Sequence, residues 1–257
     1  MKKKKTSPKK KWITTEFSFL VIHACRPETR LLRFDNGRKK CQERLRQAVI
    51  KSKASVLNYL ITPEYLRLIM AGDSAKVSEF MRFAASTIAS DHAQRTSREG
   101  PFWKGRYNAL LIQNGIHLLR VSLLIDRIMI DGEVCIYPGE WEFSGHREIT
   151  GIRKRYRIVD TKKTAELTGF ENEDILRQWY LDDSEAQRFV EGADRDLLDK
   201  ALAVGDRQAL EKIGECFARR KSGNIEVIVP DDKNPTYGLF VPNKTKNTFT
   251  RSLKENR

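Results

Sequence analysis

A short segment before residue 108 combines side chains that could bind a nucleic acid. Trp103 and Tyr107 offer aromatic faces on which bases can stack. Lys104 and Arg106 stand beside them and can donate hydrogen bonds to phosphates. This combination is typical of a surface for single-stranded DNA. Because aromatic residues also anchor ordinary cores, the alternative is that Trp103 packs inside and the charges are only solvated.

Other residues that could do chemistry are less suitably spaced. The four cysteines lie far apart and form no CxxC pair, so we expect neither a zinc site nor a disulfide framework. The acidic pairs 182–183 and 231–232 are adjacent in sequence, and adjacent side chains on a regular element point in different directions. We interpret His23 as a structural histidine of a strand. The basic cluster 153–157 is either a second phosphate-contacting strip or a solvated linker.

Charge and composition narrow the class of partner. The chain has 257 residues, 40% of them hydrophobic, and a net charge of +14. Seven lysines and no acid lie in residues 1–11, which predicts a disordered basic arm. A basic excess of this size indicates a polyanion, usually a nucleic acid. No run of 18 apolar residues and no signal-peptide pattern occurs, so we expect no membrane partner and a cytoplasmic, nucleoid-associated protein.

Hydrophobic periodicity predicts the elements that position these residues. Residues 12–150 are expected to form an α+β domain, with helices packed on an antiparallel sheet. Residues 151–222 are expected to form a helical extension, and residues 223–257 a strand followed by a loose tail. The predicted strands are 12–25, 55–61, 65–70, 107–112 and 224–229, with 55–61 and 65–70 adjacent or in a hairpin. The predicted helices are 38–53, 74–92, 116–130, 162–167, 173–189 and 194–218.

Several motifs, taken in order, resemble the REP-associated tyrosine transposases, which are small single-tyrosine HUH transposases that handle single-stranded DNA. Residues 100–107 are similar to the family signature G-x-(L/F/Y)-W-x-x-R-(Y/F). Residues 144–149 and 155–160 are similar to its SGYNEI and RYRIID stretches. The resemblance covers about residues 17–240. It implies a ferredoxin- or RRM-like antiparallel sheet with helices on one face. Further similar stretches are 56–63, 138–141 and 202–206.

The same resemblance places substitutions at the positions that carry the family's chemistry. In that family, two histidines on a strand hold a divalent metal, and a tyrosine on a helix attacks the scissile phosphate. The histidines align with Tyr65 and Arg67, and the nucleophile aligns with His117. A guanidinium does not ligate cations. We therefore expect a degenerate catalytic centre and no cofactor, with Mg²⁺ or Mn²⁺ needed only if the site is active.

Three interpretations follow. The first is a protein that binds single-stranded or hairpin DNA, in the context of transposition or recombination, without catalysis. The second is an active strand transferase or nuclease in which His117 or Tyr65 is the nucleophile and Arg67 replaces the charge of the metal. The third is an RNA-binding or regulatory module on the same scaffold. A monomer and a homodimer both fit the sequence. The nucleic-acid-binding residues that we predict are Arg67, Arg95, Arg98, Trp103, Lys104, Arg106 and Tyr107.

Overall fold

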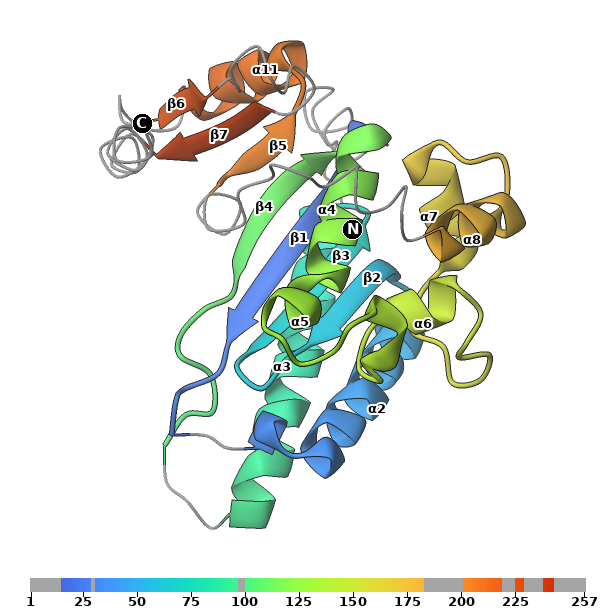
Figure 1. Ribbon diagram of the computed structural model, residues 1–257. Coiled ribbons are helices and arrows are strands. Elements are labelled where there is room, and N and C mark those ends of the chain that lie inside the picture. Colours follow the sequence, from blue (N-terminus) through green and yellow to red (C-terminus); the bar gives the residue numbers. More distant parts are fainter. Residues whose placement is uncertain are drawn as a thin grey trace, which may run out of the picture.

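A computed structural model describes residues 15–28, 31–96, 100–182, 201–218, 225–228 and 238–242. The predicted basic arm of residues 1–11 lies outside these ranges. The described chain is an α+β protein built around one sheet of seven strands (Figure 1). This confirms the predicted fold class. The strands are β1 (Phe17–Ala24), β2 (Ser55–Ile61), β3 (Tyr65–Ala71), β4 (Asn108–Gln113), β5 (Ala203–Gly205), β6 (Ile225–Ile228) and β7 (Gly238–Pro242), in the spatial order β2-β3-β1-β4-β5-β7-β6.

Polar side chains cap the start of some of the helices. The carboxylate of Asp160 accepts a hydrogen bond from the backbone nitrogen of Lys163, and the side chain of Asn172 caps the following helix. The α-helices in the described ranges are α2 (Asp35–Ser52), α3 (Ser74–Thr96), α4 (Ile116–Asp126), α5 (Ile128–Asp131), α6 (His146–Ile149), α7 (Thr161–Thr168), α8 (Glu173–Leu181) and α11 (Arg207–Ala218). The 3-10 helices are η1 (Leu31–Arg33) and η2 (Pro138–Glu140).

The strands β2, β3, β1 and β4 form an antiparallel block that sets the positions of the candidate residues. β2 and β3 form a hairpin, as predicted, and the hydroxyl of Thr62 accepts a hydrogen bond from the backbone nitrogen of Tyr65 in its turn. At one end of β1, Ala24 lies opposite Tyr65 of β3. At the other end, Phe17 lies opposite Gln113 of β4. The register therefore puts the start of β3 and the end of β4 at opposite ends of the sheet.

Helices cover both faces of this block, whereas the resemblance implied helices on one face. The hydroxyl of Tyr59 on β2 accepts a hydrogen bond from Gln42 of α2. The neighbouring Asn58 donates to Ser122 of α4. Because successive side chains of a strand point to opposite faces, α2 and α4 lie on opposite sides of the sheet. β2 and β3 are almost entirely buried, so both of their faces need cover.

The C-terminal part adds strands to the sheet. β5 pairs in parallel with β4, through Leu111 opposite Ala203 and Ile112 opposite Val204. The single helix predicted for residues 194–218 is therefore wrong at residues 203–205, because pairing with an open strand edge overrides local helix propensity there. β6 confirms the strand predicted at residues 224–229. β7 lies in the segment predicted to be a loose tail, and it pairs with both β5 and β6.

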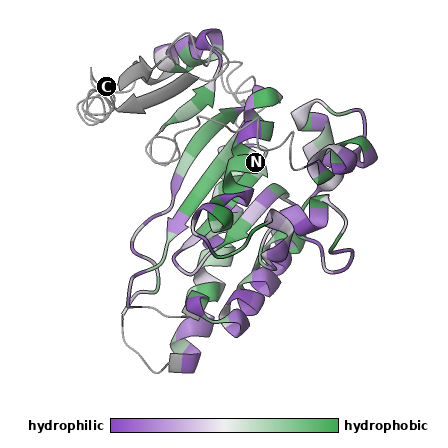
Figure 2. Cartoon of the chain, in the orientation of Figure 1, coloured by the Kyte–Doolittle hydropathy of each residue, from purple (hydrophilic) through white to green (hydrophobic). Residues whose placement is uncertain are grey.

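Hydropathy follows these layers. The central strands and α4 are mostly hydrophobic, whereas α2 is mostly hydrophilic along its length (Figure 2). In α2 the buried stripe includes Cys41, Leu45 and Ala48, which recur at helical spacing and face α3 and the sheet. Among the described helices, none has the length and apolar character needed to cross a membrane.

Candidate nucleic-acid interface

The aromatic residues of the 103–107 segment pack inward. The ring of Trp103 stacks on that of His23 with 3.8 Å between centroids and 9° between planes. Its indole nitrogen donates a hydrogen bond of 2.9 Å to the carbonyl oxygen of Ala85 in α3. The ring of Tyr107 lies nearly perpendicular to that of His23, with 6.0 Å between the ring centroids. Trp103 therefore has one ring face and its polar edge engaged within the protein, which is the arrangement of a core anchor.

The basic residues between these aromatics point outward. Lys104 and Arg106 are both exposed. The backbone nitrogen of Lys104 donates to the carbonyl oxygen of Ala24, 3.0 Å away, so the segment is fixed against the end of β1. The carbonyl oxygen of Gly105 lies 3.0 Å from Nε2 of His23. The structure thus uses the aromatics to hold the segment and presents the two cations to solvent.

His23 makes the packing of this segment pH-dependent. Burial lowers the pKa of His23 below its ordinary value, although the hydrogen bond to Gly105 acts in the opposite direction. The unfolded chain therefore binds a proton at His23 more readily than the folded chain, and stability falls as the pH drops through the ordinary histidine range. We expect chemical denaturation to show that the parent loses stability relative to His23→Phe between pH 7.5 and pH 5. A stability difference that is constant across this range would contradict the assignment.

A small pocket lies beside Lys104 at the end of β1. It has a volume of about 100 Å³, and three cationic side chains line it: Arg26, Arg33 and Lys104. Tyr65 and Glu64 complete this part of the lining. We call these five residues the basic pocket. Arg26 and Arg33 were not predicted, because they lie in the connection between β1 and α2, and only the return of the β2–β3 hairpin brings Tyr65 beside them.

Tyr65 and Arg67 lie on one face of β3, and of the two only Tyr65 lines the basic pocket. The guanidinium of Arg67 lies over the ring of Tyr65, 5.4 Å from its centroid. Tyr65 is 36% exposed, whereas Arg67 is only 9% exposed. Arg67 therefore lies behind the Tyr65 ring. Of these two side chains, Tyr65 is the more exposed to solvent. Within the described residues, no group of three His, Cys, Asp or Glu side chains is placed to hold a metal ion.

The structure places His117 far from Tyr65 and Arg67. His117 lies at the start of α4, which follows the end of β4, and it interacts with Asp206 after β5. Tyr65 lies at the opposite end of β1. Eight residues of extended strand separate these ends, which is about 23 Å. Burial lowers the pKa of His117 below its ordinary value, although the charge of Asp206 acts in the opposite direction. These three residues are not brought together into one site.

Two further residues that we predicted are Arg95 and Arg98. Arg95 is exposed in the last turn of α3, where its charge acts on Asp91. Arg98 lies outside the described residues.

The thiol of Cys25, which also lines the pocket, is buried, and its pKa rises to about 12 because of that burial and the nearby Glu64. A thiol with this pKa is not a nucleophile at neutral pH.

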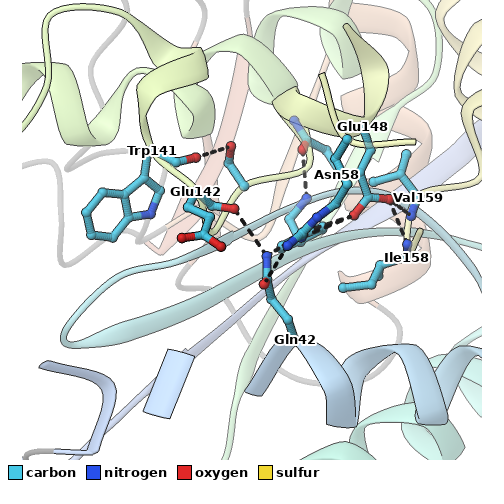
Figure 3. Close-up of polar contacts among 10 residues, drawn as sticks. Gln42, Asn58, Trp141, Glu142, Glu148, Ile158 and Val159 are labelled. Carbon is cyan, nitrogen blue, oxygen red and sulfur yellow. Dashed lines mark hydrogen bonds and ion pairs between the residues drawn. The ribbon is translucent and has the colours of Figure 1, made fainter. Parts of the chain in front are cut away.

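The stretches 144–149 and 155–160 both contribute residues to a buried polar network. One carboxylate oxygen of Glu148 accepts hydrogen bonds from the backbone nitrogens of Ile158 and Val159, at 2.7 and 2.8 Å (Figure 3). Its other oxygen accepts from the hydroxyl of Tyr59, at 3.0 Å. Arg153 donates to that same hydroxyl. We call Tyr59, Glu148, Arg153, Ile158 and Val159 the Glu148 network. Sequence reasoning missed Glu148, because its partners lie on β2 and in the loop between α6 and α7, which only the fold brings together.

A second buried group connects β2 to α4 and α8. Asn58 donates to both carboxylate oxygens of Asp126 at 3.0 Å and to the hydroxyl of Ser122 at 2.7 Å. The hydroxyl of Tyr180 donates to Ser122 as well. Burial raises the pKa of Asp126 above the ordinary carboxyl range, against the opposing effects of His146 and Asn58. All of these side chains are buried, so this group holds the elements together and has no access to a substrate.

Comparison with known proteins gives matches only among solved structures. No family model matches the chain, and no curated protein matches it. The chain is similar to a REP-associated tyrosine transposase solved bound to a REP hairpin, with 18% identity and a TM-score of 0.40. That match covers 62% of this chain and 90% of the other. It is also similar to a structure described as a candidate transposase from Deinococcus radiodurans R1, with 17% identity and a TM-score of 0.31, covering 36% of this chain and 76% of the other.

Proposed function

We propose that this protein binds single-stranded or hairpin DNA, in the context of transposition or recombination, and has lost transposase chemistry. The observation that carries the proposal is the basic pocket, where Lys104 of the family-like segment meets Arg26, Arg33 and Tyr65. Three cationic residues and one carboxylate line this pocket of about 100 Å³, so the charge around it is net positive. Such a pocket suits a phosphate group, and the exposed Tyr65 ring beside it can stack with a base.

The exposed cations extend this pocket into a footprint. Arg106 lies two residues beyond Lys104 and is also exposed. Arg67 adds a fixed charge behind the Tyr65 ring. Trp103 and Tyr107 support the footprint by holding its backbone, with their rings engaged on His23. In this proposal the cations contact phosphates, and Tyr65 is the residue that contacts a base.

The loss of chemistry rests on the residues that replace the family's catalytic groups. A tyrosine and an arginine stand at the positions that align with the metal ligands, and the residue aligned with the nucleophile lies at the other end of the sheet. The geometry gives no support to His117 as a nucleophile toward a phosphate in the basic pocket. A covalent protein–DNA adduct formed with Mg²⁺ or Mn²⁺, and absent from Tyr65→Phe, would overturn this part of the proposal.

Binding to a DNA hairpin with an unpaired flank, measured across a salt series, tests the footprint. Lys104→Ala/Arg106→Ala removes two phosphate contacts, so we expect an affinity about tenfold lower and a log–log salt slope smaller by about 1.5. Lys162→Ala/Lys212→Ala removes the same charge from exposed positions on α7 and α11, and is the matched control. Equal losses in the two double variants would show that only net charge matters. Competition with RNA of the same sequence separates this function from an RNA-binding module.

A further inference from the structure

A second group of aromatic and basic side chains lies outside the proposed footprint. It is on the loop between α6 and α7, where Lys154, Arg155 and Tyr156 are consecutive and all exposed. Tyr156 is 78% exposed, which is unusual for a large aromatic side chain. No acidic residue occurs between Glu148 and Asp160. The loop therefore presents an aromatic ring within a locally positive segment.

A cation from another element lies over this ring. The guanidinium of Arg46, on α2, is 5.5 Å from the centroid of Tyr156. Arg46 lies 110 residues away in sequence, so folding alone creates the pair. We call Arg46, Lys154, Arg155 and Tyr156 the Tyr156 platform. Its four side chains join one stacking surface to three positive charges from two elements.

The platform is held in place on both sides. On one side, Arg153 donates hydrogen bonds to the hydroxyl of Tyr59 and to Oε1 of Gln42, both at 3.1 Å. On the other side, the backbone nitrogens of Ile158 and Val159 donate to Glu148. Tyr156 therefore lies between two positions, residue 153 and residues 158–159, that hydrogen bonds fix to the rest of the fold. A ring fixed in this way loses little conformational freedom when a ligand stacks on it.

The backbone of Tyr156 also carries strain. Its φ is +55°, in the left-handed region that a bulky side chain rarely adopts. Such a conformation costs free energy unless the surrounding structure imposes it. Here the loop keeps an exposed tyrosine at a position that glycine or asparagine would occupy more easily. An observed outlier of this kind, together with exposure and charge, points to a function for the ring.

We propose that the Tyr156 platform binds unpaired nucleotides, with a base stacked on Tyr156 and the neighbouring phosphates paired with Lys154 and Arg155. A base in a duplex has both faces covered by its neighbours, so the platform selects unpaired strands. This inference rests on the proposed nucleic-acid-binding function and adds to it a contact point that shares no residue with the basic pocket. Because the recognised chemistry is common to single-stranded DNA and RNA, both belong in the test.

Fluorescence of 2-aminopurine placed within an unpaired oligonucleotide tests the stacking directly. The parent is expected to quench the fluorescence of the probe and to bind the oligonucleotide about tenfold more tightly than Tyr156→Ala does. The assay is run with a DNA and an RNA oligonucleotide, and the difference is expected with at least one of them. Tyr156→Phe keeps the ring and is expected to bind within twofold of the parent. A fully paired duplex of the same length is expected to bind Tyr156→Ala and the parent equally.

Other outcomes separate this site from the proposed footprint. If Tyr156→Ala binds like the parent while Lys104→Ala/Arg106→Ala binds weakly, the platform is wrong and the footprint stands. If the reverse holds, the platform stands and the footprint is wrong. A parent that binds neither polymer at low salt overturns both. Tyr156→Asn, which suits a left-handed φ, is expected to unfold at the parent's temperature or above, so weaker binding by this variant cannot come from misfolding.

Discussion

Replacement of Glu148 by alanine is expected to lower the free energy of unfolding by about 4 kcal/mol. The change removes the acceptor of two backbone N–H groups and of the Tyr59 hydroxyl, and it leaves Arg153 without its nearby carboxylate. Each buried donor that loses its partner costs about 1–3 kcal/mol. For a chain of this size the melting temperature should fall by roughly 10 °C, which differential scanning calorimetry would measure.

Glu142→Ala is the matched control for that measurement. Glu142 contributes its carbonyl oxygen, which accepts from Gln42, and the substitution keeps that oxygen. We expect this variant to stay within about 1 kcal/mol of the parent. Glu148→Gln retains one acceptor oxygen and should fall between the two. If Glu148→Ala were as stable as Glu142→Ala, the network would not be what holds residues 158 and 159 against β2.

Gly145→Ala is expected to destabilise the fold by about 3 kcal/mol. A Cβ at this position would overlap Oδ1 of Asn58 and lie 2.9 Å from the backbone nitrogen of Tyr59. The chain cannot move away easily, because the backbone nitrogen of Gly145 donates a 2.7 Å hydrogen bond to the carbonyl oxygen of Tyr59. Urea denaturation of the parent and the variant would measure the difference.

Gly105→Ala provides the comparison for the glycine. Nothing lies within 4 Å of a Cβ placed at Gly105, and this glycine has no positive φ, so the change should cost less than about 0.5 kcal/mol. Asn58→Ala removes the side chain that the new methyl would meet. The cost of Gly145→Ala should therefore be smaller in an Asn58→Ala background, and strictly additive costs would argue against the steric explanation.

These two predictions bear on the meaning of the motifs in the sequence. Gly145 and Glu148 belong to the stretch similar to SGYNEI, and Ile158 and Val159 to the stretch similar to RYRIID. In the structure the two stretches bind each other and β2 through buried hydrogen bonds. These parts of the resemblance therefore lie in residues that hold the fold. At the positions that the resemblance aligns with the family's metal ligands and nucleophile, this chain has Tyr65, Arg67 and His117.

Much of the fold was predictable because hydrophobic periodicity is local. The strands β1 to β4, the hairpin at Thr62 and the helices α2 and α3 follow from the spacing of apolar residues and from the turn residues between them. β5 and β7 were not predicted, because short strands at the edge of a sheet depend on the partner they pair with. The sequence also did not predict that helices cover both faces of the sheet, because this depends on the face against which α4 packs.

By itself the sequence determined the basic excess, the order of the core elements and the presence of a tyrosine at position 65 and an arginine at position 67. Residue identity decides those properties, so no fold is needed to read them. Only the tertiary structure decided that Trp103 packs on His23 and that Arg26 and Arg33 join Lys104 in a pocket. It also separated His117 from Tyr65 and brought Arg46 over Tyr156. Such contacts follow from strand register and from the course of loops between distant segments, and local periodicity does not encode them.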